Sequence, residues 1–223
     1  EGVFLAKWGA RGSADAASIR DLDRIELERF RFRYLRPAQT VIALAGVSRG
    51  LHLDGLSDTA DGFFSSRPRE RILEIMRDSH IGAMGAAAIT CVLLLKVAAL
   101  ASLAQDARWP AVLLIPLAGR CALVVTVAVL PYARPGGGLG TVFYRARPRA
   151  AAIWAVLLLA LVGWITAKEV GLAAAAGSVA FTLLFAWYSY RKIGGATGDT
   201  LGAACEIAEI ISALTITMRP LEG

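Results

Sequence analysis

A succession of apolar runs long enough to cross a bilayer constrains the fold of this chain most. Runs of near-membrane length occur at 82–104, 110–131, 150–167, 171–190 and 201–217, and a shorter, marginal run lies at 38–53. A bilayer core requires about 20 apolar residues per helix, with a range of roughly 17–25. Because 56% of the residues are hydrophobic, the sequence predicts an all-α, polytopic integral membrane helical bundle with five to six transmembrane helices.

The N-terminal segment differs from the rest of the chain. Residues 1–36 are polar and contain eight basic residues, with apolar positions near helical spacing, which indicates an amphipathic helix on the membrane surface. We therefore expect a peripheral segment at 1–36 and a single transmembrane catalytic domain at 37–223. The net charge of +6 fits such a membrane surface, and it gives no support for nucleic-acid binding.

The distribution of Lys and Arg predicts the orientation. The loops 54–81, 132–149 and 191–199 hold ten of these residues, whereas the alternating loops hold three. The positive-inside rule places the ten on the cytoplasmic side of the inner membrane. A full crossing by the run at 38–53 would put the basic segment 1–36 outside, against that rule. Either this run is a re-entrant or half-length element, or a crossing before it is absent from this sequence.

The densest group of acidic residues lies in LHLDGLSDTADGFF, residues 51–64. Asp54, Asp58 and Asp61 stand at i, i+4 and i+7, so on a helix they fall within roughly 60° of one another. Three carboxylates so close repel in a low dielectric, and Mg²⁺ is commonly held by one or two carboxylates plus substrate phosphates. The spacing predicts a Mg²⁺ site. The alternative is a solvated helix start with Asp54 as its N-cap.

Two further segments carry candidates for phosphate binding. In MRDSHIGAMG, residues 76–85, Arg77 offers a guanidinium to phosphate and Asp78 offers a carboxylate as metal ligand or base. Asp78 or Ser79 could instead cap the helix that follows. In LPYARPGGGLG, residues 130–140, Arg134 stands beside a glycine triplet whose amides suit phosphate.

Acidic residues inside the last apolar run form the fourth group. In GGATGDTLGAACEIAE, residues 194–209, Asp199 opens the run and Glu206 follows seven residues later on the same helical face. Ionisable groups inside a span usually face the bundle interior or a cavity, so Glu206 is predicted to belong to the site. The alternative is pairing with Lys96 or Arg120, which also need partners inside the membrane.

The four groups together point to one reaction class. By the count of basic residues they lie on one side of the membrane, where acidic groups for a metal meet Arg side chains for phosphate. This combination suits transfer at a phosphoanhydride, in which Mg²⁺ neutralises a diphosphate, a carboxylate orients an attacking hydroxyl, and a nucleotide leaves.

At HLDGLSDTADG, residues 52–62, the chain resembles the cobalamin synthase family. Three further segments resemble family segments in the same order: EIMRDSHIGAMG, PYARP and TGDTLGAACEIAE. The resemblance covers roughly residues 50–215.

The resemblance implies an adenosylcobinamide-GDP ribazoletransferase, which joins GDP-activated adenosylcobinamide to α-ribazole or its 5′-phosphate, releases GMP and requires Mg²⁺. Carried over by position, the metal ligands would be Asp54, Asp58 and Asp61. Catalysis is assigned to Asp58, Asp78 and Glu206, and substrate binding to His52, Arg77, Arg134 and Asp199. The expected partners are the two substrates and the lipid bilayer. A homo-oligomer, or contacts with other enzymes of cobalamin assembly, stays open.

Two other classes of protein share part of this pattern. The CDP-alcohol phosphotransferases also place spaced Asp residues at a cytoplasmic helix end, but their pattern continues with an Ala-Arg pair and further Asp residues, which SDTADGFFSSRPRE does not supply. A cation-coupled transporter could use the same carboxylates. Transporters tend to have repeated halves and broken helices at mid-membrane, whereas here the acidic residues gather at one surface.

Overall fold

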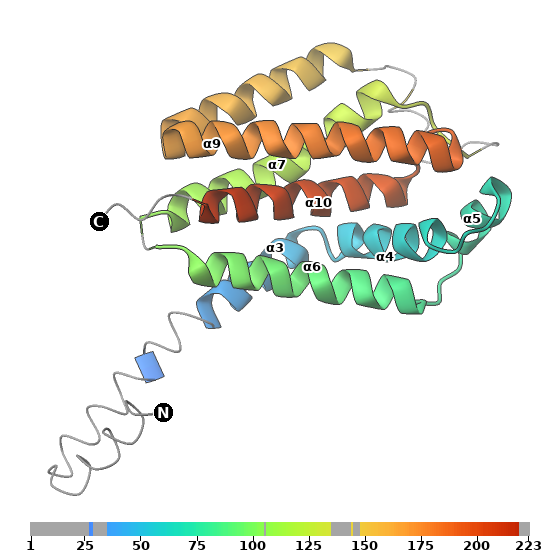
Figure 1. The fold of residues 1–223 in the computed structure, drawn as a ribbon, viewed down its shortest axis with the longest axis horizontal. Helices are drawn as coiled ribbons and strands as arrows, with labels where there is room; N and C mark the ends of the chain where they lie inside the picture. The colour runs from blue at the N-terminus through green and yellow to red at the C-terminus, as the bar shows by residue number, and fades with distance from the viewer. Residues whose placement is uncertain (1–26, 29–34, 105, 135–143, 145–147, 219–223) are drawn as a thin grey trace, which may run out of the picture.

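The computed structural model describes residues 27–28, 35–104, 106–134, 144 and 148–218. The described chain contains helices and no strand: α3 (Arg36–Val47), α4 (Leu51–Phe63), α5 (Arg69–Ile75), α6 (Ala83–Ser102), α7 (Arg108–Val129), α9 (Arg149–Ile193) and α10 (Gly198–Thr217). The long helices lie side by side along one direction (Figure 1). The predicted all-α bundle is confirmed. The predicted surface helix of residues 1–36 and the glycine triplet at 136–138 fall almost entirely outside the described residues.

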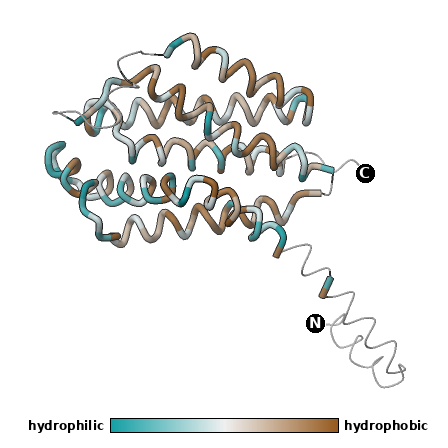
Figure 2. Tube along the Cα trace, turned by 180° about the vertical axis from the view of Figure 1, so that it is seen from behind, coloured by the Kyte–Doolittle hydropathy of each residue, from teal (hydrophilic) through white to brown (hydrophobic). Residues whose placement is uncertain are grey.

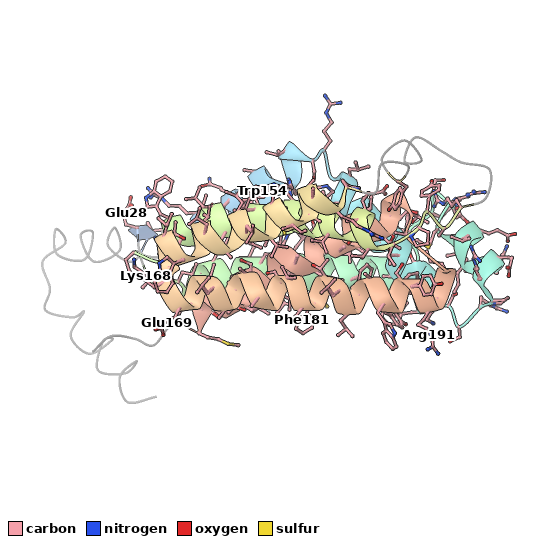
Figure 3. The ribbon with its side chains drawn as sticks, turned by 90° about the horizontal axis from the view of Figure 1, so that it is seen from above. Glu28, Trp154, Lys168, Glu169, Phe181 and Arg191 are labelled. Atoms are coloured by element: carbon pink, nitrogen blue, oxygen red, sulfur yellow. The ribbon has the colours of Figure 1, made fainter. Side chains whose placement is uncertain are left out.

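Four of these helices, α6, α7, α9 and α10, are long and apolar enough to cross a membrane. The 45-residue α9 is a hairpin, because Lys168 has non-helical dihedral angles (φ 51°, ψ −128°) and separates legs at 149–167 and 169–193. Figure 3 shows the two legs side by side, with Lys168 and Glu169 at the turn and Arg191 at the opposite end. The four helices therefore provide five legs of membrane length, in agreement with the predicted runs.

Two glycines allow the legs of α9 to approach each other closely near the turn. A Cβ on Gly163 would lie 2.6 Å from the carbonyl oxygen of Gly171, and a Cβ on Gly171 would collide with the backbone of Gly163. Small residues at such crossings let membrane helices pack backbone to backbone. The hairpin therefore depends on glycine at both positions.

The marginal run at 38–53 does not form one membrane-crossing helix. It is divided between α3 and α4, which are separated by Arg49 (φ 51°) and Gly50 (φ 74°) in left-handed conformations. Left-handed residues end a helix because its backbone hydrogen bonds cannot continue through them. Of the two explanations for the charge conflict, the structure supports a half-length element at α3.

Helix α10 lies at the centre of the bundle. It packs against α4, α6, α7 and α9, and its buried positions are mostly small, including Ala203, Ala204, Ala208 and Ala213 at 0–1% exposure. Four neighbours can surround one helix closely only where its side chains are small. The central position of α10 means that every other long helix is placed relative to it.

The three Arg-rich loops lie together at one end of the bundle. The backbone of Ala133 donates to Ala196 O at 2.8 Å, and Ala196 donates to Pro131 O at 2.9 Å. Arg69 donates to Ala133 O at 3.1 Å, and so ties the 64–82 region to the same place. Figure 2 shows hydrophobic residues along the spans and hydrophilic residues at the end that carries α5. The predicted grouping of these loops is confirmed.

Candidate active site

The three aspartates of α4 share one face of a helix, as predicted. The helix begins at Leu51, with Gly50 as N-cap, so the alternative in which Asp54 caps the helix is wrong. Asp54 is exposed, whereas Asp58 and Asp61 are partly buried. The face turns progressively from solvent into the bundle, and Asp58 lies at its middle.

Asp199 reaches this face because α4 and α10 cross at two glycines. A Cβ on Gly55 would lie 2.7 Å from the carbonyl oxygen of Asp199, and a Cβ on Gly202 would lie 2.9 Å from that of His52. The N-terminus of α10 itself is fixed by a capping box, in which the Thr197 hydroxyl accepts from the Thr200 amide. The crossing and the cap together set Asp199 beside the aspartates of α4.

Arg134 and Asp199 form the polar contact that joins the third and fourth sequence groups. Arg134 Nη2 donates to Asp199 Oδ2 at 2.5 Å, and the Thr197 hydroxyl donates to the same oxygen at 3.2 Å. Arg134 Nη2 also lies 3.4 Å from the carbonyl oxygen of Met76. Arg134 therefore links the loop after α7, the start of α10 and the loop that holds Arg77.

Asp54, Asp58, Asp61 and Asp199 form the aspartate cluster, and its electrostatics are dominated by negative charge. The pKa of Asp58 is raised to about 6, first by burial and then by repulsion from Asp54, Asp199 and Asp61, while Arg134 opposes the shift. Three carboxylates near a fourth with one guanidinium leave excess negative charge, which a cation would neutralise. Asp58 is ionised at neutral pH but protonates in mild acid.

Asp61 has a structural role that the spacing did not reveal. Its carboxylate accepts the Gly82 amide at 2.8 Å and the Gly85 amide at 2.9 Å, so it satisfies the open amides at the start of α6. The alternative in which Asp78 or Ser79 caps this helix is wrong, because the cap comes from α4. Each Asp61 oxygen retains a second lone pair, and its role as a metal ligand stays a prediction.

Asp78 and Arg77 lie on the exposed loop between α5 and α6. The Asp78 carboxylate bonds to His80 Nδ1 at 2.5 Å and accepts the His80 amide at 3.1 Å. These bonds lower the pKa of Asp78, and the carboxylate raises the pKa of His80. Asp78 is thus held in the ionised form on this exposed loop. The catalytic role of Asp78 and the phosphate-binding role of Arg77 stay predictions.

Glu206 lies two turns deeper along α10, in a separate buried ion cluster. Lys96 Nζ donates to Glu206 Oε2 and to Glu209 Oε2, both at 2.6 Å. Arg120 Nη1 donates to Glu209 Oε1 at 2.8 Å. The structure shows Glu206 paired with Lys96, which is the alternative that the sequence left open. The catalytic role of Glu206 stays a prediction. The sequence signal for this buried ion cluster was one basic residue inside each of two apolar runs, Lys96 and Arg120.

His52 belongs to the buried ion cluster more than to the aspartate cluster. Its Nδ1 lies 3.4 Å from Cys205 Sγ, and Arg120 Nη1 lies 3.4 Å from the same sulfur. Burial, followed by the positive charge of Arg120, lowers the pKa of His52. The structure therefore separates His52 from Arg134 and Asp199, with which it was grouped as a substrate-binding residue.

Lys192 completes the site's framework and was missed by the sequence reasoning. It donates to the carbonyl oxygen of Phe63 at 3.0 Å, and so joins the end of α9 to the end of α4. Basic residues in this loop were counted only for membrane orientation. Their contacts with backbone carbonyls depend on which loops meet in space.

No metal site is assembled from protein side chains alone in the described part of the chain. There, no three His, Cys, Asp or Glu side chains are gathered as a group that could hold a metal ion. Mg²⁺ is usually bound by one or two carboxylates together with substrate phosphates and water. The aspartate cluster supplies oxygen ligands of the kind that Mg²⁺ prefers, and the excess negative charge around Asp58 suits a divalent cation.

Comparison with known proteins identifies one family. The family model described as cobalamin-5-phosphate synthase matches residues 27–217. The adenosylcobinamide-GDP ribazoletransferase of Roseiflexus sp. (strain RS-1) is 48% identical over 187 residues, which cover 82% of this chain and 68% of that protein. The protein of the same name from Desulforamulus reducens is 43% identical over 170 residues, 76% of this chain and 67% of that protein.

A third relative shows similar coverage. The adenosylcobinamide-GDP ribazoletransferase of Acetivibrio thermocellus is 39% identical over 179 residues, 78% of this chain and 72% of that protein. No solved structure matches this chain. The match to the family model includes all of α3 to α10 and every residue of the aspartate cluster.

Proposed function

The chain belongs to the cobalamin-5-phosphate synthase family, and from this premise we propose that it is an adenosylcobinamide-GDP ribazoletransferase with its active site at the aspartate cluster. The observation that carries the location is the convergence of Asp58, Asp199 and Arg134 from three separate segments. The substrates would be adenosylcobinamide-GDP and α-ribazole or its 5′-phosphate. The products would be adenosylcobalamin or its phosphate, together with GMP.

The reaction is a displacement at the phosphoanhydride. An oxygen of the ribazole acceptor forms a bond to the phosphorus attached to cobinamide, the bond between this phosphorus and the bridging oxygen breaks, and GMP leaves with that oxygen. With either acceptor the attacking oxygen is a hydroxyl, because attack by the 5′-phosphate would form an anhydride and not the named product. The hydroxyl proton passes to a carboxylate of the cluster. Asp58 lies at the middle of the α4 face, and its pKa of about 6 keeps it ionised, and able to accept a proton, at neutral pH.

We assign Mg²⁺ to Asp58 with its neighbour Asp54. These residues are one helical turn apart, so their carboxylates can share a cation, whereas Asp54 and Asp61 are separated by about 10 Å along the helix axis. When bound, Mg²⁺ would neutralise charge on the diphosphate. Arg134, beside Asp199, is placed to offer its remaining guanidinium donors to a phosphate oxygen.

We infer that the end carrying the aspartate cluster faces the cytoplasm of an inner-membrane protein. Three Arg-rich loops converge on this end, and short loops rich in Lys and Arg are retained on the cytoplasmic side. GMP release and nucleotide-activated substrates also suit a cytoplasmic site. Labelling of single cysteines placed at exposed Arg67 and at Lys168, in intact spheroplasts, would test the orientation.

The activity is tested by giving purified protein in nanodiscs adenosylcobinamide-GDP and α-ribazole or its 5′-phosphate, and following GMP. We expect GMP release that depends on Mg²⁺ and stops when the metal is chelated. Asp58→Asn should abolish release while thermal unfolding stays unchanged, because the substitution keeps the side-chain shape. Wild-type turnover by Asp58→Asn would refute the location of the site, and absence of GMP from the wild type would refute the reaction.

A further inference from the structure

A cavity lies at the end of the bundle opposite the aspartate cluster, between the start of α3, the end of α6 and the start of α7. Its volume is about 400 Å³, and its walls include Arg36, Thr40, Leu100, Arg108, Trp109 and Val112. In the view of Figure 1 this is the end at which α6 ends and α7 begins. The lining residues of α3 lie 60 or more positions away in the sequence from those of α6 and α7, so the cavity is a product of the tertiary fold.

One half of the cavity is suited to an anion. Arg108 brings a guanidinium group to it, Arg36 also lines it, and none of the described residues in its wall is acidic. The Nε atom of Arg108 is enclosed and makes no hydrogen bond within the described part of the chain. Guanidinium groups present several donors in a fork that matches the oxygens of a phosphate.

The other half of the cavity is apolar. Leu100 and Val112 line it, and Leu113, which follows Val112 on α7, is 51% exposed. Trp109, 76% exposed, stands at the first turn of a span, where indole rings settle at the headgroup level of a membrane. The site thus combines a phosphate-binding group with an apolar wall at the depth of a lipid headgroup.

We propose that this cavity binds the phosphate group of an anionic glycerophospholipid, with an acyl chain lying along α6 and α7. A soluble anion would use only the cationic half, whereas a phospholipid uses both halves. Basic pockets between transmembrane helices can bind the head groups of anionic lipids. The inference is independent of the transferase activity, because the cavity lies at the other end of the spans.

The test measures thermal unfolding of the purified chain in nanodiscs of phosphatidylcholine, with and without phosphatidylglycerol. We expect phosphatidylglycerol to raise Tm of the wild type by roughly 2–4 °C. Arg108→Gln should lose this rise, and Arg108→Lys should keep part of it. The matched control is Lys168→Gln, which removes one positive charge at the same end but outside the cavity, beside Trp164, and should keep the full rise.

Three results of this Tm series would overturn the proposal: no rise in Tm for the wild type, an undiminished rise for Arg108→Gln, or an equal loss of the rise for Lys168→Gln, which would show unspecific surface attraction.

Two further measurements test the identity of the ligand. Inorganic phosphate added to the protein in detergent should leave Tm unchanged, and a rise equal to that with lipid would assign the cavity to a soluble anion. Native mass spectrometry of the wild type gives a second measurement that needs no variant. Phosphatidylglycerol should stay bound after phosphatidylcholine has dissociated, and equal loss of both would contradict the site.

Discussion

Removal of Lys96 is the sharpest test of how the bundle holds charges inside the membrane. Its ammonium group bonds to Glu206 and Glu209 at 2.6 Å each. All three side chains are only 5–6% exposed. Lys96→Met leaves Glu206 without its cation, whereas Glu209 retains Arg120 at 2.8 Å. The variant therefore creates one uncompensated buried carboxylate.

Breaking a buried ion pair by removal of one partner costs about 3–5 kcal/mol. We therefore expect Lys96→Met to lower Tm by roughly 6–20 °C. The double variant Lys96→Met with Glu206→Met removes both charges and replaces them with apolar side chains, so it should recover most of the loss. Arg71→Met breaks a pair of similar length, 2.7 Å, whose side chains are 63% and 61% exposed, and it should cost about 0–1 kcal/mol.

Thermal unfolding of the four proteins in one detergent, followed by intrinsic tryptophan fluorescence, measures these differences. We expect a large loss of Tm in Lys96→Met, a small loss in Arg71→Met and a recovery in the double variant. An uncompensated buried charge is refuted if Lys96→Met unfolds at the wild-type temperature, or if the double variant is as unstable as the single one. In the second case the loss would come from packing and not from an unpaired charge.

Three further predictions concern the site and its packing. The pKa of Asp58 is raised to about 6, so its carboxylate is protonated below this pH and ionised above it. GMP release and Mg²⁺ affinity should therefore both fall as the pH drops through 6. An activity profile that stays flat down to about pH 5 contradicts this. Arg134→Met should raise KM for adenosylcobinamide-GDP roughly 10–100-fold. Arg134→Lys should restore only part of the substrate affinity, because an ammonium cannot form the same fork of bonds. Equal KM values for the wild type and both variants would exclude phosphate binding by Arg134. Gly85→Ala should destabilise the protein by about 1–3 kcal/mol, because a Cβ at this position collides with Ser57 and Asp61. The control is Gly198→Ala, which should cost nothing, because a Cβ at Gly198 meets no atom within 4 Å. Equal Tm values for the two variants would argue against the contact at Gly85.

Local periodicity explains why parts of the site could be predicted. Helical spacing alone places Asp54, Asp58 and Asp61 on one face, and the structure has this segment as the helix α4. The count of basic residues correctly grouped the loops that hold Arg134 and Asp199. Helical spacing and the count of basic residues both depend on runs of residues and not on distant contacts. The turn between the α9 legs was also visible, as a break in apolar character near Lys168.

Hydropathy could not reveal the break between α3 and α4. The run at 38–53 is apolar on both sides of Ser48, Arg49 and Gly50, and Arg49 and Gly50 end the helix through their left-handed backbone conformation. A left-handed residue is selected by the packing of the helices on either side as much as by its own preference. Composition therefore predicted one marginal span where the fold has two short helices.

The sequence by itself determined the membrane-crossing runs, the end at which the charged loops meet and the shared face of the three aspartates, because each follows from hydrophobicity or from the 3.6-residue period. Only the tertiary structure decided what each carboxylate does there. Asp61 caps α6, Asp199 bonds to Arg134 and Glu206 bonds to Lys96. A carboxylate in a low dielectric must find donors or cations within a few ångströms, and the helices that bring those partners together come from distant parts of the chain.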